Sequence, residues 1–408
     1  MGEWSDWWGR NVFGLPTWLL IVPILAFLIF VHELGHFLTA KLFGIKVTEF
    51  AFGFPPRLFG VRRGETLYSI NLLPLGGFVR MVGEEDPTEE RSFASQTVLK
   101  RAIVLSAGSF MNLLTPLVIF TLLFALPQDT AVGAVMIRGV APNSPAAEAG
   151  LRPGDTILSV DGKTVDNHLV VIEQVMASLG SEIELTVRRG SIVSGLSMSL
   201  DSSVVDTVSV VPRLNPPEFT VVETVTDPDT EISIRKARRY NGQLQVGDTM
   251  EQGSVGVMVG TSNVKMVKRR EPVWNAVPAA LGRMTDILKI TKNGFARWFS
   301  GGPDPGLTGP IGIARVTGEV AEAGISPVFE LMALISISLA IMNILPIPAL
   351  DGGRLMFVII EWVRRGKRIP PQKEGLVHLV GFALMIGFIV VISYFDIARI
   401  LSGDSFFR

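Results

Sequence analysis

Residues 11–40 read NVFGLPTWLLIVPILAFLIFVHELGHFLTA, and this stretch decides how the rest of the chain is interpreted. It is uncharged from Asn11 to Val31 and longer than the roughly 20 apolar residues that a helix needs to cross a bilayer. It then contains the pattern H-E-x-x-H at His32, Glu33 and His36. Ionisable residues are costly inside a membrane and by default indicate a functional site. The stretch therefore predicts a membrane-spanning helix that carries a polar site.

The spacing of this motif indicates a zinc site. Two histidines four residues apart on a helix project from one face, so His32 and His36 can both bind a zinc ion at about 2.0–2.1 Å. Glu33 can then act as general base on a water activated by the metal, and later as proton donor to a leaving amine. The alternative is that these polar groups only pair with other helices. The motif alone also leaves open a zinc transporter and a soluble protease domain.

Composition narrows the class of protein. The chain has 408 residues, a formal net charge of -1 and 48% hydrophobic residues, which favours a mixture of membrane and soluble parts. It has no cysteine, so any metal must be held by histidine, aspartate or glutamate. The balanced charge and the lack of a basic block with interleaved aromatic residues exclude nucleic acid as an expected partner.

Four stretches are long and apolar enough to span a membrane. They are Asn11 to Ala40, Ala102 to Gln128, Leu331 to Leu350 and Gly375 to Phe395. Lysine and arginine gather after the first stretch and between the third and fourth, so both of these connections are expected to be cytoplasmic. The N-terminus, the long middle region and the C-terminus are then outside.

A cleaved signal peptide is the competing interpretation of the first stretch. Its leading residues, Glu3, Asp6 and Arg10, are not a basic segment, and no small-residue cleavage site follows the apolar run. We therefore expect this stretch to remain attached.

A β-hairpin is predicted between the first two spans. Glu49 to Phe54 and Thr66 to Leu73 are β-prone and are separated by a turn-like segment, and Gly76 and Gly77 follow the second run. The apolar residues that flank the glycines suit a re-entrant hairpin that dips into the bilayer where protein or a wet cavity satisfies its backbone. A hairpin on the cytoplasmic surface is the alternative.

The middle region predicts a small α+β module with an extension. Short strands at Ala134 to Val140, Thr156 to Val160 and Glu182 to Arg188 surround a helix near Leu169 to Leu179. The run SPAAEAGLRPGDTILSVDGKTV, residues 144–165, resembles the signature of a PDZ domain, a fold that binds extended peptides at a sheet edge. Residues 214–266 contain no second copy of that signature and are interpreted as an extension of the module.

Residues 271–299 have the pattern of an amphipathic helix. Such a helix can lie at a membrane interface, or it can pack on the module.

Asp351 is the best candidate for a third metal ligand. A catalytic zinc usually has three protein ligands and one open position. The run NILPIPALDGG, residues 343–353, ends the third span with two prolines and two glycines that interrupt helical hydrogen bonding. A broken helix at membrane depth is tolerated where it faces protein or a water-filled cavity. This places Asp351 near the cytoplasmic end of its span, at the level of His32 and His36.

Other ionisable residues are weaker candidates. His378 begins the fourth span, and a lone histidine near an interface is more often a snorkelling or hydrogen-bonded residue than a metal ligand. His168 is expected at the surface of the middle module. Glu330 and Glu361 flank spans and are interpreted as interfacial charges.

At this point the sequence resembles the site-2 protease family of intramembrane zinc metalloproteases, in the PDZ-containing form that includes regulator-of-sigma-E proteases. The resemblance rests on VHELGHFLTAKLFGI, LLPLGGFVRMVGE, the PDZ signature, GPIGIA and NILPIPALDGG, which occur in the family's order. It implies His32, His36 and Asp351 as zinc ligands and Glu33 as the catalytic acid and base. It also implies a substrate-binding role for Asn343, Pro346, Pro348, Gly76 and Gly77.

The resemblance predicts a multi-pass α-helical membrane protein with about four transmembrane helices, a re-entrant β-hairpin and an inserted α+β PDZ domain. Its parts are a first membrane half (1–130), the PDZ domain with its extension (131–270), an interfacial helix with a linker (271–328) and a second membrane half (329–408). The expected location is a bacterial inner membrane, with the PDZ domain outside and the active site near the cytoplasmic side.

The implied function is second-step cleavage of single-span membrane proteins, such as anti-sigma factors or signal-peptide remnants, inside the lipid bilayer. Two alternatives come from other classes. A noncatalytic PDZ-bearing scaffold is disfavoured by the intact motif, Asn343 and Asp351. A zinc transporter is disfavoured because paired metal-binding residues should then occur on several spans.

Overall fold

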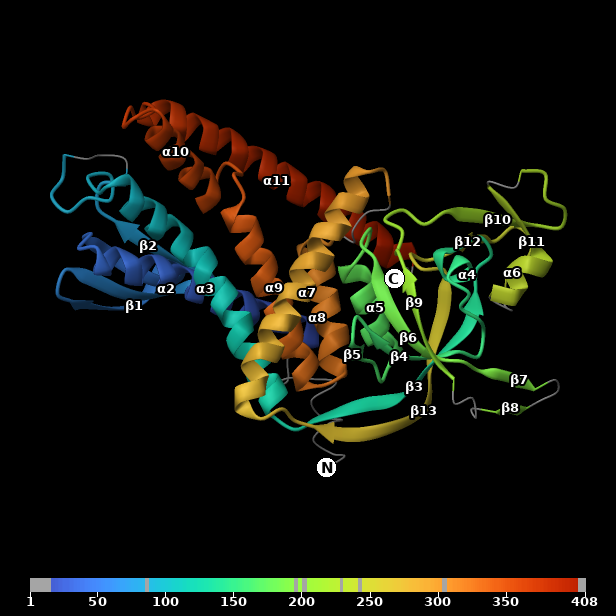
Figure 1. The fold of residues 1–408 in the computed structure, drawn as a ribbon. Coiled ribbons are helices and arrows are strands. Elements are labelled where there is room, and N and C mark those ends of the chain that lie inside the picture. The colour runs from blue at the N-terminus through green and yellow to red at the C-terminus, as the bar shows by residue number, and fades with distance from the viewer. Residues whose placement is uncertain are drawn as a thin grey trace. The chain divides into compact units, whose positions relative to one another are not determined.

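The computed structural model describes residues 16–84, 88–193, 197–199, 204–227, 230–240, 244–302 and 307–402 (Figure 1). The chain forms two compact units. The first, here called the membrane unit, comprises Met1–Leu123 and Gly306–Arg408, and the second, here called the middle unit, comprises Phe124–Pro305. The start of the first predicted span, residues 11–15, lies outside the described residues.

Four helices of the membrane unit are long and apolar enough to cross a bilayer, as the sequence predicted. They are η1 with α2 (Thr17–Leu20 and Ile21–Leu42), α3 (Val98–Ala125), α9 (Ile325–Ile344) and α11 (Pro371–Ser402). The third ends six residues before the predicted Leu350, because Pro346 disfavours the helical conformation at Leu345, which is extended with φ -64° and ψ 146°. Half of the most apolar part of α3 is buried in the protein, against 6% for α11. The surface of α11 therefore suits contact with lipid.

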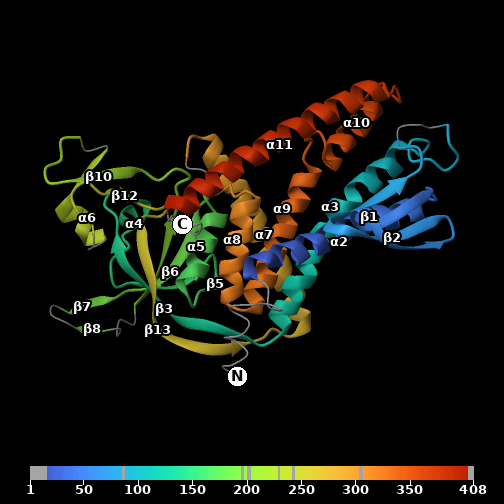
Figure 2. The ribbon, with the colours of Figure 1, turned by 180° about the vertical axis from the view of Figure 1, so that it is seen from behind.

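The predicted hairpin between the first two spans is present, with more pairing than expected. β1 (Val47–Arg63) and β2 (Thr66–Met81) both bend, so that Phe50 pairs with Tyr68 on one side and with Val79 on the other. The result is a small sheet in the order 57–63, 66–73, 47–54, 77–81, in which residues 49–52 and 67–70 run in the same direction and the outer strands run opposite to their neighbours. It lies alongside α2 (Figures 1 and 2). Residues 77–81 form one outer edge of this sheet.

Two shorter helices complete the membrane unit. α8 (Pro310–Glu322) begins in the GPIGIA run, and α10 (Asp351–Val363) begins at the candidate metal ligand. The first turn of α8 is held by Asp396 of α11, whose carboxylate accepts hydrogen bonds from the N–H groups of Gly309 and Gly312 at 3.2 and 2.9 Å. Asp396 is fully buried, so these bonds satisfy both a buried charge and the unpaired donors at a helix start.

The middle unit contains the predicted α+β module. Its main sheet has the strand order β13-β3-β4-β6-β9, with β5 paired to β4. The strands are β3 (Gln128–Val140), β4 (Thr156–Val160), β5 (Lys163–Thr164), β6 (Ile183–Arg188), β9 (Val205–Val210) and β13 (Val257–Arg269). The helices α4 (Pro145–Glu148) and α5 (His168–Ala177) belong to the same module, and a separate small ribbon pairs β7 (Ser191–Val193) with β8 (Ser197–Ser199). The apolar core lies among Val135, Ile137, Ile157, Val171, Ile183 and Leu185.

The amphipathic helix predicted at 271–299 is α7 (Val273–Phe299), and one of its faces packs on this module. Asp286 of α7 accepts from Lys163 Nζ and Gln174 Nε2, both at 3.3 Å, and Asn293 Nδ2 donates to the carbonyls of Met176 and Ala177. A different set of side chains on α7 is exposed and apolar: Val273, Trp274, Val277 and Leu281. Packing on the module, one of the two alternatives, therefore accounts for one face of the helix.

Residues 214–252 form a small sheet of their own, with the strand order β11-β10-β12. β10 (Glu218–Val222), β11 (Glu231–Ser233), β12 (Thr249–Glu251) and α6 (Ile234–Tyr240) enclose a core of Val221, Ile232, Ala237 and Met250.

This small sheet repeats a strand–turn–strand unit of the main module. In the module, Gly154 has φ 98° and its N–H donates to Ile137 O, while Asp155 Oδ2 accepts from the N–H of Arg152. In the small sheet, Gly247 has φ 98° and donates to Val221 O, while Asp248 Oδ2 accepts from the N–H of Gln245. The shared pattern in sequence is L-x-x-G-D-T, at residues 151–156 and 244–249. The segment is therefore a partial structural copy of the module that precedes it.

Candidate metal centre

Three side chains from distant parts of the chain converge inside the membrane unit. His32 Nε2 lies 2.9 Å from Asp351 Oδ2, His36 Nε2 lies 3.1 Å from the same oxygen, and the two Nε2 atoms are 3.1 Å apart. Both histidines are buried, and the Asp351 side chain is 23% exposed. These three residues form a group of possible metal ligands within the part of the chain that the structure describes.

The geometry fits a zinc ion. A tetrahedral zinc with bonds of about 2.0–2.2 Å separates its ligand atoms by roughly 3.3–3.6 Å, so the three atoms need to move apart by only about half an ångström. Two imidazoles and one carboxylate are a common ligand set for a catalytic zinc with an open position. Space for the imidazoles comes from Gly108 of α3, where an added Cβ would lie 2.4 Å from His36 Nε2 and 2.6 Å from His32 Nε2.

Groups on α3 also fix the orientation of the two imidazoles. His36 Nδ1 lies 2.7 Å from the carbonyl oxygen of Val104, which leaves Nε2 without a proton and able to bind a metal. His32 Nδ1 lies 3.3 Å from Asn112 Nδ2, and Asn112 Oδ1 is buried with no hydrogen-bond partner among the described residues. With zinc bound to Nε2, the Nδ1–H of His32 needs an acceptor, which the amide of Asn112 supplies when it turns its oxygen inward.

Asp351 is positioned by the broken segment that follows α9. Leu345 ends the helix in an extended conformation, and the N–H of Ile347 donates to Leu345 O across a tight turn. A Cβ on Gly352 would lie 2.0 Å from Leu345 O, and one on Gly353 would lie 2.5 Å from Ile347 O. The two glycines are therefore required for α10 to start directly against this segment, with Asp351 as its first residue.

Helix α11 supports the same segment from its other side. His378 Nδ1 accepts a hydrogen bond from the N–H of Ala349 at 2.9 Å, and Ala349 has a left-handed φ of 77°. One turn further along α11, a Cβ on Gly381 would lie 2.2 Å from Pro348 Cβ. The sequence interpretation of His378 as a hydrogen-bonding residue agrees with this contact.

Glu33 lies between the metal ligands and the outer edge of the hairpin sheet. Its carboxylate interacts with the backbone N–H of Val79, and a Cβ on Gly77 would lie 3.6 Å from Glu33 Cγ. The same added Cβ would lie only 2.6 Å from the carbonyl oxygen of Ala51. Any side chain at position 77 would therefore clash with the neighbouring strand. Gly76, with φ 146°, is next to Gly77. Gly77 is therefore required by the close approach to Ala51 within the sheet, and the strand edge that contains it lies next to Glu33.

The other residues predicted for substrate binding lie on the segment that leads to Asp351. Asn343 is half-buried in the last turn of α9, and Pro346 and Pro348 follow it in the non-helical segment. Pro346 is exposed, whereas Pro348 packs against α11 at Gly381.

Sequence reasoning missed three features near the site. Gly108 and Asn112 were not predicted as site residues, although they occupy one face of a span at the i, i+4 spacing, which could have indicated a shared role. Glu361 was interpreted as an interfacial charge, and its buried ion pairs were not predicted. It is 7% exposed and pairs with Arg101 Nη2 at 2.7 Å and with Arg368 Nε at 3.2 Å. Long-range partners of this kind cannot be read from local sequence.

Comparisons with known proteins identify the relatives of this chain. The sequence profile of peptidase family M50 matches residues 20–388. A protein of Clostridium perfringens that bears a zinc-metalloprotease name is 34% identical over 381 residues, covering 93% of this chain and 98% of that protein. A similarly named protein of Fusobacterium nucleatum is 32% identical and covers 95% and 100% of the two chains. The zinc metalloprotease RasP of Geobacillus kaustophilus is 27% identical over 467 residues, covering 94% and 98%.

Proposed function

The chain belongs to peptidase family M50, the site-2 protease family of zinc metalloproteases, and from this premise we propose that it cleaves single-span membrane proteins within or near their transmembrane segments. One observation carries the proposal: a group of zinc-binding side chains lies among candidate membrane spans, with a carboxylate and an open strand edge beside it. A soluble metalloprotease has no need to place its site there.

His32, His36 and Asp351 are the proposed zinc ligands. A zinc ion bound by them would polarise the scissile carbonyl and make water a stronger nucleophile at neutral pH. The protein's own contribution is to hold the donors in place, through Val104 and Asn112 for the imidazoles and through the Pro346–Asp351 segment for the carboxylate.

Glu33 is the proposed general base and acid. It follows His32 directly on α2, and its carboxylate lies close enough to His32, His36 and Asp351 to interact with their charges. In this role it takes a proton from the attacking water and returns it to the leaving amine. No other acidic side chain among the described residues joins the ligand group.

The edge strand of the hairpin is the proposed holder for the substrate. A transmembrane helix hides its peptide bonds in internal hydrogen bonds, so it must be unwound before a carbonyl carbon can be attacked. Residues 77–81 offer an outer edge to which an unwound segment can add as a further strand. Gly76 and Gly77, at the start of this edge, are proposed to contact the substrate backbone, and Asn343, with Pro346 and Pro348, is proposed to hold the other side of the extended segment.

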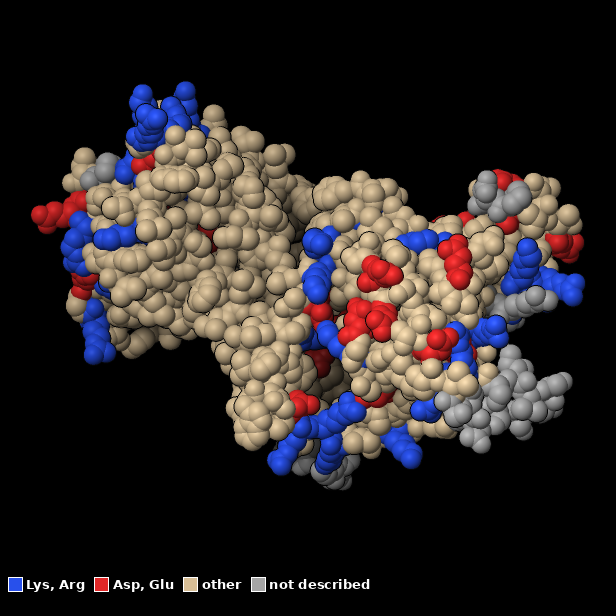
Figure 3. Space-filling view, in the orientation of Figure 1, with Lys and Arg blue, Asp and Glu red and all other residues tan. Residues whose placement is uncertain are grey.

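The proposed substrates are proteins that have already lost their external domain, such as cleaved anti-sigma factors and signal-peptide remnants. The middle unit, proposed to be a PDZ domain with an extension, would then act outside the membrane as a filter against uncut proteins. The proposed location is a bacterial inner membrane with the metal centre near the cytoplasmic face. Lysine and arginine gather at the hairpin tip and at the link between α10 and α11, which supports this orientation (Figure 3).

A reconstituted cleavage assay tests the proposal. Purified protein in detergent is incubated with a single-span reporter, and cleavage and bound zinc are measured for wild type and Glu33→Gln. We expect Glu33→Gln to retain zinc and lose cleavage by at least about a hundredfold, the lower range for removal of a general base. Unchanged cleavage by this variant would refute the assignment, and cleavage of a soluble peptide but of no membrane reporter would refute the substrate class.

A further inference from the structure

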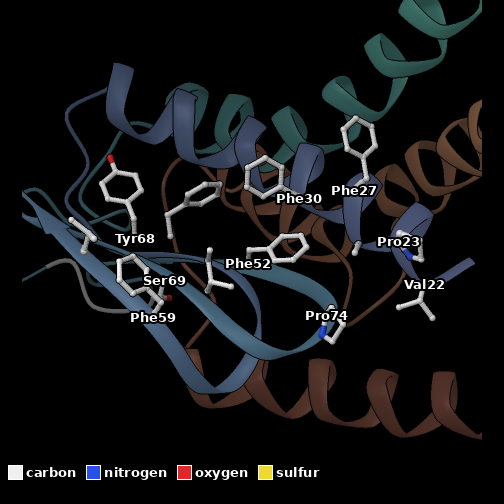
Figure 4. Close-up of a pocket in the computed structure, with 13 residues that line it drawn as sticks. Val22, Pro23, Phe27, Phe30, Phe52, Phe59, Tyr68, Ser69 and Pro74 are labelled. Atoms are coloured by element: carbon white, nitrogen blue, oxygen red, sulfur yellow. The ribbon is translucent and has the colours of Figure 1, made fainter. Parts of the chain in front are cut away.

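An apolar crevice lies between part of α2 and the face of the hairpin sheet, beside the contacts that Phe30 makes with Phe50 and Phe52. Its volume is about 780 Å³, and Figure 4 shows aromatic side chains from both elements turned into it. The lining residues of α2 are Val22, Pro23, Ala26, Phe27 and Phe30, and those of the sheet are Phe50, Phe52, Phe59, Val61, Tyr68, Ser69, Ile70 and Pro74. The metal ligands and Glu33 are not among them, so the crevice is distinct from the candidate metal centre.

The crevice has an apolar end and a basic end. Pro74 lies at one end and Tyr68 at the other (Figure 4). Along the outer strand, alternate residues share a face, so Phe59 and Val61, which line the crevice, are followed on that face by Arg63. Arg63 pairs with Thr66 at the hairpin tip, beyond the Tyr68 end. It is exposed, whereas Arg62 points to the opposite face of the same strand.

The basic end lies where we propose the cytoplasmic surface to be. The hairpin tip is fixed to the end of α2 by Glu65, which pairs with Lys41 Nζ at 2.8 Å. Cytoplasmic segments of membrane proteins carry an excess of lysine and arginine, and the cytoplasmic leaflet is rich in anionic lipid. A phosphate at Arg63 and a hydrocarbon chain that runs toward Pro74 would therefore both be in their preferred surroundings.

The polar groups of the lining favour a hydrocarbon chain over a peptide. An extended peptide would bring unpaired N–H and C=O groups into the crevice, which is costly at membrane depth. Tyr68 and Ser69 are the lining residues with polar side chains, and Ser69 Oγ already donates to Glu49 Oε1 at 2.8 Å. An acyl chain needs no hydrogen bonds.

We propose that this crevice binds an acyl chain of an anionic phospholipid from the cytoplasmic leaflet, with the lipid phosphate at Arg63. The acyl chain would fill the space that α2 and the hairpin sheet leave between them. This inference rests on the proposed orientation in the membrane but not on the proposed cleavage reaction.

Native mass spectrometry of the full-length protein tests the charged end. The protein is incubated with phosphatidylglycerol or phosphatidylcholine of identical chains, and retained lipid is counted. We expect wild type to retain phosphatidylglycerol, and Arg63→Gln to reduce its preference over phosphatidylcholine about fivefold, the effect of one basic residue near a lipid headgroup. Arg62→Gln is the matched control and should leave the preference unchanged. Equal effects of the two variants would refute a defined phosphate position.

A second pair of variants tests the apolar end. Val61→Trp places a larger side chain in the crevice, and we expect it to reduce retention of both lipids severalfold. Leu58→Trp adds the same side chain at an exposed position outside the lining and should have no effect. Zinc content and melting temperature are measured for all variants, so that loss of folding is recognised. If Val61→Trp retains lipid but blocks reporter cleavage, the crevice binds substrate and the proposal is wrong.

Discussion

Asp351 and Asp396 are two aspartates of the membrane unit with opposite surroundings. Asp351 Oδ2 faces the Nε2 atoms of His32 and His36, and its side chain remains 23% exposed. Asp396 is fully buried and accepts hydrogen bonds from the N–H groups of Gly309 and Gly312. The Asp351 carboxylate faces imidazole nitrogens that can also bind a metal, whereas the Asp396 carboxylate faces backbone N–H groups that donate hydrogen bonds.

The difference shows how an acidic residue among candidate membrane spans should be interpreted. Such residues default to a functional hypothesis because an unpaired charge there is costly. Asp396 escapes that cost by satisfying a helix start, which is a structural role. Asp351 lies beside other lone-pair donors, an arrangement that becomes favourable when a cation joins it. Partner type, rather than burial, separates the two roles.

The largest expected effect is that of Asp351→Asn. We expect loss of zinc and a decrease in cleavage well beyond the 10–100-fold typical of an outer partner of a metal site. The melting temperature of the zinc-free protein should change little, because the Asp351 side chain is partly exposed. Metal analysis, the reporter assay and a thermal melt in detergent check this. Full zinc occupancy in the variant would remove Asp351 from the ligand set.

Asp396→Ala should produce the opposite result. Loss of two hydrogen bonds to a charged acceptor, with both donors left buried, should lower the free energy of unfolding by roughly 3 kcal/mol. Zinc content per folded molecule should remain that of wild type. Thermal melts and metal analysis on the same preparation check both statements. A variant that melts like wild type but has lost its zinc would erase the contrast between the two aspartates.

Asn112→Leu tests whether the contact between Asn112 and the ligand His32 contributes to zinc binding. Leucine keeps the volume of the side chain but cannot accept from His32 Nδ1–H, so we expect zinc affinity to fall 10–100-fold. Competition with a chelator measures it. Asn112→Asp is the matched variant, because its carboxylate can still accept that proton, and it should keep most of the affinity. Equal losses in both variants would indicate that Asn112 only fills space.

Much of the candidate site could be predicted because its signals are local. The spacing of His32 and His36 and the prolines before Asp351 are properties of short segments, and the predicted strand Thr156 to Val160 has the bounds of β4. The role of Asp396 could not be predicted in this way. Its partners lie more than 80 residues earlier in the chain, so nothing near Asp396 indicates them.

The partial copy in the middle unit was missed for another reason. Only Leu244, Gly247, Asp248 and Thr249 repeat the signature, while the strand before them differs in every side chain that faces the core. Gly247 is kept because its φ of 98° favours glycine, and Asp248 because its carboxylate closes the turn. Four residues are too few to identify a repeat before the backbone is known.

The smallest expected effect is the change in melting temperature when Glu65 is replaced. The Glu65 carboxylate lies outside the membrane spans and serves as a reference for the two aspartates. Hydrogen bonds from Arg91 and Lys41 lower the pKa of Glu65 from 4.5 to about 2. Because the folded state holds the proton less tightly, this group stabilises the fold above about pH 4.5 and loses that contribution as the pH falls toward 2. The contribution is small because the three side chains are partly exposed.

The measurement is the difference in melting temperature between wild type and Glu65→Gln across this range of pH. Any loss of zinc at low pH affects both proteins alike, so that effect cancels in the difference. We expect wild type to melt slightly higher at pH 6 and the two proteins to converge near pH 2. A difference that stays constant down to that pH would mean that Glu65 acts through packing rather than charge, and the contrast among carboxylates would then rest on Asp351 and Asp396 alone.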